Sequence, residues 1–413
     1  MILRLPKALS ILDGVPGAFL AAYFAVMFAG NCTALTWSPC SDGWLLIDRN
    51  GAALTKPRTG PIGGGPWSSY WLVRPYSLFL LGTEILDSRG KVVLRPKKRQ
   101  AFFSRPYDGL ILMARIRADA EGNGEAGPFG FVNLRGQLVI PPIFGSAQLF
   151  WDGLAPARPY HHRRWGYIDE HGKWVVTPTY ESAGMLFPVG LGAVQIQSHP
   201  EKWGFVDSRG RLAFTLPAGW HVGSRPLWPG SFTRDRLAIV TTTGKKGRLF
   251  GAINTDGKLV IPMHHWQHLF PFHNGRAMVA MREHGHVRWG IINMKGQYIV
   301  RPKFYNAARK FHDQLAWVQL GRDVGSPASY AIINRHGKTV LTSKTLLLNA
   351  SVYDGRIIVG KMVGGYHLLG FANLRGKVVI RFQYREAYPF YGGVAAVELP
   401  PKAAKGVAVF PKK

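Results

Sequence analysis

The chain has 413 residues, of which 46% are hydrophobic and only two are cysteine. This composition excludes a small disulfide-stapled scaffold and a disordered tail, and the length fits two or three domains or one tandem-repeat array. The 52 Lys and Arg residues outnumber the 23 Asp and Glu residues, giving a net charge of +29. Such a charge favours polyanionic partners: nucleic acid, anionic lipid surfaces or acidic cell-wall polymers.

The N-terminal segment resembles a secretory signal. Two basic residues precede an uncharged stretch over 14–41 with an apolar centre. This pattern predicts a cleaved signal or a retained anchor over residues 1–34, with a buried first element as the alternative. Cleavage after Ala34 would remove Cys32 and so exclude a bridge to Cys40. We therefore expect a secreted, periplasmic or cell-envelope protein, with the cytoplasm as the alternative, and contact with a membrane only through an uncleaved N-terminal segment.

An Asp/Asn-x-x-Gly element recurs nine times along the chain. Asp or Asn accepts backbone hydrogen bonds from two residues on, and Gly adopts positive φ at little cost, so each element predicts a tight turn. We call it the first turn of each repeat. A second turn, often Asp-Gly, follows before the next repeat, and the residues between turns alternate or are β-branched, as in strands. The first-turn glycines are Gly51, Gly90, Gly136, Gly172, Gly210, Gly257, Gly296, Gly337 and Gly376.

An aromatic-glycine pair precedes most of these turns, as in RWGYIDEHG (164–172), KWGFVDSRG (202–210) and RWGIINMKG (288–296). These segments resemble the WG repeat, a bacterial tandem repeat named for its tryptophan-glycine pair. The resemblance covers most of residues 43–399. It implies an all-β repeat with no assigned activity in most members and no catalytic residues or cofactors. The positions that carry it are Trp165, Gly166, Asp169, Gly172, Trp203, Gly204, Asp207, Gly210, Trp289, Gly290, Asn293 and Gly296.

Each repeat is long enough for four short antiparallel strands, so we predict an all-β fold of propeller-like blades, with an open β-solenoid as the alternative. Nine repeats exceed the usual range of roughly four to eight blades. Two degenerate repeats with a Gly/Pro linker (35–125) are therefore expected outside a seven-bladed ring formed by 126–399, unless the array is open. The basic C-terminal segment 400–413, which contains a strand over 405–410, closes a ring or caps an open end.

The densest basic cluster, residues 91–105, places cations beside two phenylalanines. Alternating cations and aromatic rings hold phosphates and stack on bases, although a solvated strand edge has the same pattern. The candidate partner-binding cations are Lys97, Lys98, Arg99 and Arg105.

Tryptophans that precede the turns in a fixed phase are expected to pack between repeats. Four tryptophans outside this phase, Trp151, Trp220, Trp228 and Trp266, are candidates for partner contact, with local packing as the alternative.

The sequence offers little evidence for catalysis or metal binding. Six histidines between His264 and His286 suggest a zinc site or, as the simpler interpretation, polar loop residues; we expect no metal and no cofactor. Most patterned Asp residues lie in turns and alternate with Asn, which keeps the turn but not the acid. No nucleophile, P-loop or metalloprotease motif is present in the sequence. A glycan hydrolase would need a carboxylate pair across a cleft.

The sequence thus predicts a non-enzymatic repeat scaffold that binds a polyanionic or protein partner at the bacterial cell envelope. The alternative is a nucleic-acid-associated basic repeat protein, and a weaker alternative is a glycan hydrolase.

Overall fold

The computed structural model describes most of the chain beyond residue 42. The predicted signal segment, the Cys32–Cys40 bridge, Trp228 and the strand over 405–410 lie outside the described residues. All described residues belong to one compact unit, Ser41–Lys413. Within them, no helix has the length and apolar character needed to cross a membrane. The described ranges are 43–57, 62–63, 71–73, 84–118, 124–186, 188–223, 232–245, 247–321, 330–342, 352–363 and 365–400.

The described residues form antiparallel β-sheets and no helix, so the predicted all-β fold is confirmed. One blade shows the plan: β13 (Ser182–Ala183), β14 (Leu191–Ser198), β15 (Glu201–Asp207) and β16 (Leu212–Thr215) pair in chain order. The second turn joins the first two strands of the blade and the first turn joins the last two. Both turns therefore lie at the same end of the sheet, since alternate connections of an antiparallel meander do so.

The other blades follow this plan with small variations. One contains β17 (Trp220–Val222), β18 (Leu237–Gly244), β19 (Gly247–Asn254) and β20 (Leu259–His264). The next contains β21 (His268–Leu269), β22 (Arg276–Glu283), β23 (His286–Asn293) and β24 (Tyr298–Phe304). Then come β25 (Asn306–Ala307), β26 (Leu315–Gln319), β27 (Tyr330–Asn334) and β28 (Thr339–Thr342). A three-stranded sheet holds β29 (Arg356–Val363), β30 (Tyr366–Asn373) and β31 (Val378–Tyr384).

The early repeats include one sheet that serves two blades. A four-stranded sheet contains β2 (Ile62–Gly63), β3 (Trp71–Val73), β4 (Ile85–Leu86) and β5 (Val92–Leu94). A seven-stranded sheet contains β6 (Gln100–Phe102), β7 (Leu110–Ala118), β8 (Gly124–Asn133), β9 (Leu138–Ala147), β10 (Leu154–Pro159), β11 (Trp165–Asp169) and β12 (Trp174–Tyr180). Strand β9 pairs with β8 near its start and with β10 at its end. It is therefore the last strand of one blade and the first strand of the next. We call the last strand of a blade its outer strand and the first its inner strand.

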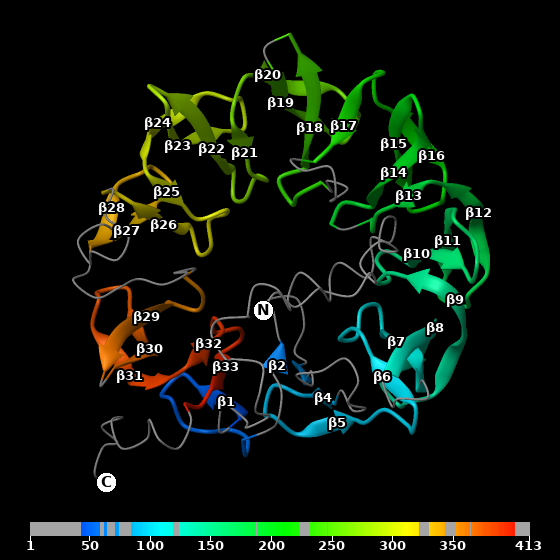
Figure 1. Cartoon of the computed structure of the whole chain (residues 1–413), viewed down its shortest axis with the longest axis horizontal. Coiled ribbons are helices and arrows are strands. Elements are labelled where there is room, and N and C mark those ends of the chain that lie inside the picture. Colours follow the sequence, from blue (N-terminus) through cyan, green and yellow to red (C-terminus); the bar gives the residue numbers. More distant parts are fainter. Residues whose placement is uncertain are drawn as a thin grey trace, which may run out of the picture. The chain divides into compact units, whose positions relative to one another are not determined.

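The two ends of the described chain meet in one sheet. Strand β1 (Trp44–Asp48) pairs antiparallel with β33 (Val394–Glu398), and β33 pairs with β32 (Glu386–Ala387). Figure 1 shows β1 and β33 side by side. The strand that meets an early strand is thus β33, which precedes the predicted 405–410 segment. The open solenoid is wrong, because this sheet connects the first repeat to the last.

Hydrophobic packing links every blade to the next. Nine clusters of buried residues each lie between two successive blades, including the one between the β29–β31 sheet and the closing sheet. In that last cluster, Leu45 and Ile47 of β1 lie with Phe371 and Ile380. The first two repeats belong to this closed series, so their expected place outside a seven-bladed ring is wrong. Although the sequences of these two repeats are degenerate, their strands keep the aliphatic residues that pack against the neighbouring blades.

The aromatic-glycine pair has a packing explanation. The rings of Trp165, Trp203 and Trp289 are buried between blades. The glycine that follows lies under the neighbouring outer strand: a Cβ placed on Gly166 would lie 2.2 Å from the carbonyl oxygen of Val176. Any larger residue at this glycine would push the outer strand away.

Candidate anion-binding site

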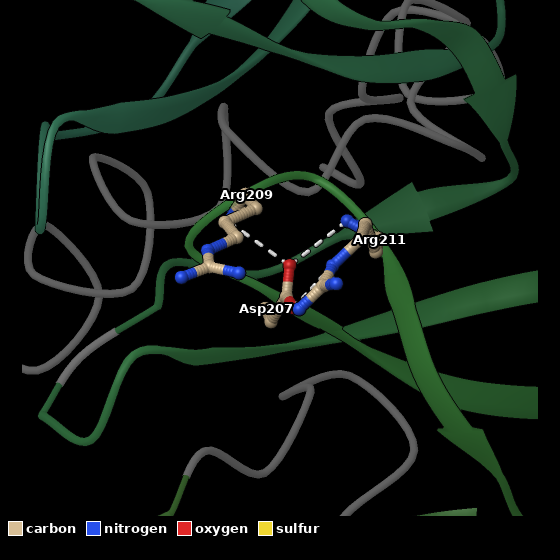
Figure 2. Close-up of polar contacts among 3 residues, drawn as sticks. All are labelled: Asp207, Arg209 and Arg211. Carbon is tan, nitrogen blue, oxygen red and sulfur yellow. Dashed lines mark hydrogen bonds and ion pairs between the residues drawn. The ribbon is translucent and has the colours of Figure 1, made fainter.

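The first turns share one hydrogen-bonding geometry, shown for Asp207, Arg209 and Arg211 in Figure 2. The Oδ1 atom of Asp207 accepts hydrogen bonds from the backbone N–H groups of Arg209 and Arg211, each at 2.9 Å. Gly210 has φ of +77°. In the copies with asparagine, such as Asn373, Oδ1 accepts the equivalent pair of bonds. The side-chain oxygen therefore fixes the turn, and no acid is required.

Asp207 also pairs with a cation. Its Oδ2 atom lies 2.8 Å from Nη2 of Arg211. Burial acts to raise the pKa of the Asp207 carboxyl, but the hydrogen bonds and charge from Arg211, together with the bond from Arg209, hold the pKa below its ordinary value. This carboxyl is therefore ionised at neutral pH and neutralises part of the local positive charge.

The first turns carry cations at equivalent positions. In eight of the nine turns, a Lys or Arg lies directly before or directly after the glycine. All of these side chains are exposed. They are Arg89, Lys91, Arg135, Lys173, Arg209, Arg211, Lys258, Lys295, Lys338, Arg375 and Lys377. Cations occur in every repeat of the sequence, and the fold places those of the first turns at one end of each sheet.

Each first turn also touches the preceding blade. A Cβ placed on Gly136 would lie 2.9 Å from Leu94, and one on Gly172 would lie 2.9 Å from Ile140. The contacted residue is always the fourth after the preceding first-turn glycine, in all nine copies. A turn therefore presents its cations beside the outer strand of its neighbour.

At the second and third repeats this arrangement forms a cleft of about 290 Å³, which we call the basic cleft. The segment directly after β5 contributes Arg95 and Lys97, and the third first turn contributes Arg135. Phe102 and two glutamine side chains also line it. Arg95 Nε donates to Glu84 at 2.8 Å in an ion pair, which orients its guanidinium and offsets part of its charge. The cleft thus combines three cations with amide donors, the chemistry that holds phosphate or sulfate groups.

The predicted basic residues are distributed around this cleft, and only one lines it. Lys97 is a lining residue, whereas Lys98 and Arg99 are exposed in the adjacent turn, where Arg99 has φ of +61°. Arg105 is half-buried and donates to the hydroxyl of Tyr107 at 3.1 Å. Sequence reasoning missed Arg135, which is distant in the chain. Its position directly before a first-turn glycine was the available signal.

Of the tryptophans outside the repeat phase, Trp220 and Trp266 pack locally. Trp266 is 5% exposed, and its indole N–H donates to the hydroxyl of Tyr298 at 3.0 Å. Its ring is therefore covered and offers no stacking surface. Trp220, in β17, is half-buried and packs against the cluster that contains Trp203.

A second cleft, of about 170 Å³, lies between the β13–β16 and β17–β20 blades. Its lining includes Glu201, whose carboxylate accepts a hydrogen bond from the Trp203 indole at 2.6 Å and lies 2.7 Å from Nδ1 of His221. Glu201 therefore bridges two blades. Arg248 also lines this cleft.

Second turns are linked from blade to blade by carboxylates. Asp354 Oδ2 accepts a hydrogen bond from the backbone N–H of Gly393 at 2.7 Å, and Asp235 Oδ1 accepts one from Gly275 at 3.1 Å. These acids are structural. Beside Asp354, the hydroxyl of Tyr353 shares a hydrogen bond with Nε2 of His312.

In the described part of the chain, no group of three or more His, Cys, Asp or Glu residues could hold a metal ion, and this part includes the segment from His264 to His286. Glu386 and Glu398 are cross-strand partners, and burial together with the Glu398 charge raises the pKa of Glu386. Neither glutamate lines either cleft.

Comparison with known proteins identifies the repeat. A family model described as the WG containing repeat matches residues 129–158, 165–196, 250–283, 289–322 and 370–399, which confirms the resemblance. The first turns at Gly51, Gly90, Gly210 and Gly337 lie outside these matches. No curated protein matches the sequence.

The chain is similar to several solved structures of low sequence identity. One described as a eukaryotic initiation factor is 11% identical, with a TM-score of 0.54 over 87% of this chain and 99% of that one. Dipeptidyl peptidase 4 of Porphyromonas gingivalis is also 11% identical, with a TM-score of 0.46 over 78% of this chain and 59% of that one. The β-propeller domain of the trilobed protease of Pyrococcus furiosus is 12% identical, with a TM-score of 0.35 over 69% and 99%.

Proposed function

We propose that this chain, a WG-repeat protein, is a non-catalytic scaffold that binds a polyanion through the basic cleft. The observation that carries the proposal is the convergence of Arg95, Lys97 and Arg135 from two successive repeats on one cleft. Phosphate or sulfate groups gain charge-assisted hydrogen bonds there, and binding releases counterions. The net charge of +29 would draw any polyanion toward the chain.

The cell envelope is part of this proposal. The signal-like sequence over 1–34 and the basic charge support a role among acidic surface polymers. Cell fractionation with mass spectrometry of the N-terminus tests it. A chain that starts near Leu35 in the periplasm or medium is the expected result, and an intact Met1 in the cytosol would overturn the envelope role while leaving polyanion binding to be tested separately.

The binding test compares two charge-matched double variants of the full chain. In Lys97→Ala/Arg135→Ala the cleft loses two cations; Lys202→Ala/Lys361→Ala removes two exposed cations that do not line it. The probe is tripolyphosphate, measured by isothermal titration calorimetry at rising NaCl. We expect the cleft variant to lose affinity and the slope of log K against log [salt] to become shallower by about two, because each cation neutralises about one phosphate.

The matched control should bind as the natural chain does. Equal losses in both variants would mean that the charge acts from the whole surface and that the cleft is no site. Absence of any binding by the natural chain would refute the proposed function.

A further inference from the structure

The first turns are not equally charged. Counted from the Asp or Asn to the residue after the glycine, the eighth and ninth turns each carry a net charge of +2, and the second, third, fifth and seventh turns each carry +1. The first turn is neutral, because Asp48 offsets Arg49. The fourth turn carries −1, because Asp169 and Glu170 outweigh Lys173, and the sixth is neutral, because Asp256 offsets Lys258. The eighth, ninth, first, second and third turns together therefore carry a net charge of +6, whereas the fourth to seventh turns together carry +1.

The fold brings these repeats together. The ninth and first repeats are neighbours, since a Cβ placed on Gly51 would lie 3.2 Å from Ile380. Across the same seam, Arg356 Nη2 donates to the backbone carbonyl of Arg49 at 3.5 Å, and the Arg49 side chain lies 3.7 Å from Asp354. The equivalent glycine contacts join the eighth repeat to the ninth, the first to the second and the second to the third. Turns from the two ends of the chain thus follow one another without a gap.

We infer that these turns form one continuous binding surface for a flexible, linear polyphosphate-type polymer, with the basic cleft at one end. We call it the seam arc. Its exposed cations are Arg335, Lys338, Arg375, Lys377, Arg49, Arg89, Lys91 and Arg135. The inference rests on the proposed function and goes further, because it gives the ligand a path, a length requirement and a chemical class.

The repetition of the turns and the closed series of blades favour a long, flexible polymer as the ligand. One turn offers one or two solvated cations, which bind a single anion weakly. A polymer that reaches several turns binds more tightly because each further contact is intramolecular. Since the series of blades is closed, successive turns follow a curved path. Double-stranded DNA, with a persistence length of about 50 nm, does not follow such a path without a bending cost, whereas a flexible polymer does.

The decisive variants differ only in their place in the series. Arg375→Ala/Lys377→Ala removes two cations from the seam arc, and Lys173→Ala/Lys258→Ala removes two cations from equivalent positions in the fourth and sixth turns. Both affect exposed side chains. Binding of the full chain to long-chain polyphosphate is measured by fluorescence anisotropy over a range of NaCl concentrations, with tripolyphosphate as the short ligand.

We expect the arc variant to bind long-chain polyphosphate at least tenfold more weakly than the natural chain, with a salt slope shallower by about two. Its affinity for tripolyphosphate, which reaches only the cleft, should be unchanged. The fourth-and-sixth-turn variant should match the natural chain with both ligands. Long-chain polyphosphate should also bind more tightly than double-stranded DNA of equal charge.

Three results would overturn the inference. The two variants could lose long-chain affinity equally, the arc variant could retain it, or duplex DNA could bind as tightly as polyphosphate. In each of these cases a loss of tripolyphosphate binding in Lys97→Ala/Arg135→Ala would still support the proposed function. Failure of that cleft variant to change tripolyphosphate binding would refute the proposed function itself.

Discussion

Gly51 packs against Ile380, so the first repeat is fitted to the last by the same contact that joins every other pair of neighbours. In each case a first-turn glycine lies against the residue four positions after the preceding first-turn glycine. The glycine thus has two functions: it adopts positive φ, and it leaves room for a neighbouring side chain. The sequence of a single repeat predicts only the positive φ, because the neighbouring side chain belongs to another repeat.

The double role predicts different costs for two glycine substitutions. Gly337 and Gly109 have nearly equal φ values, +77° and +76°. A Cβ on Gly337 would lie 2.2 Å from Cγ2 of Val300, whereas nothing lies within 4 Å of one on Gly109. Both alanine variants should lose roughly 1–2 kcal/mol for the left-handed backbone. Gly337→Ala should lose about 1–3 kcal/mol more from overpacking, measured by urea unfolding. Equal losses of stability would show that Val300 moves away from the added methyl group at little energetic cost.

A second prediction concerns the turn oxygen. Asp207→Asn keeps an acceptor for the N–H groups of Arg209 and Arg211, as in sister repeats, and loses only an exposed ion pair. We expect a change within about 0.5 kcal/mol in the free energy of unfolding. Asp207→Ala removes the acceptor and should cost roughly 1 kcal/mol. If Asn were as destabilising as Ala in thermal or urea unfolding, the carboxylate charge and not the turn geometry would be the stabilising feature.

The repeat pattern predicted most of the fold because the same local chemistry occurs nine times. Turn residues, strand residues and the buried tryptophans follow from one repeat. What one repeat could not reveal is the blade boundary. A blade takes its inner two strands from one sequence repeat and its outer two from the next, so β33 completes the sheet that begins with β1. Because each blade combines strands from two successive repeats, every repeat contributes to the closed series of blades, including the repeats that keep few consensus residues.

The candidate site was predicted only in part. Lys97 stood out because it lies in a dense basic run, but its partner Arg135 is an isolated cation in sequence. The two meet because a first turn lies against the preceding outer strand, which is a contact between repeats. Trp266 was a candidate because it breaks the repeat phase, yet it is buried, since an extra aromatic ring fills space between two blades.

A third prediction follows from His312 at the second turns. Burial, the charge of Lys310 and the nearby His273 lower the pKa of His312 to about 3. In the unfolded chain the pKa is about 6.5, so the unfolded state takes up the proton first as pH falls. The stability that His312 contributes is therefore complete above pH 6.5 and declines between 6.5 and 3. The pKa of His273 is also lowered, chiefly by burial, so it acts in the same direction.

His312→Gln removes this titration while keeping a polar partner for the Tyr353 hydroxyl. Between pH 6.5 and 4 the natural chain should lose up to about 1.4 kcal/mol per pH unit more than the variant, the value for one proton. Urea unfolding at several pH values measures the difference. Parallel stability curves for the two proteins would mean that His312 titrates normally in the folded state.

The last prediction separates packing from ligand contact at Trp266. Its ring lies in the cluster between the β17–β20 and β21–β24 blades, and its indole N–H donates to Tyr298. Trp266→Ala should cost roughly 3–5 kcal/mol through the cavity that it leaves. Tyr298→Phe, which removes only the hydrogen bond, should cost about 1 kcal/mol. Trp266→Phe keeps most of the packing and should bind long-chain polyphosphate with unchanged affinity. Weaker polyphosphate binding by this variant, in its folded state, would show that Trp266 contacts the ligand.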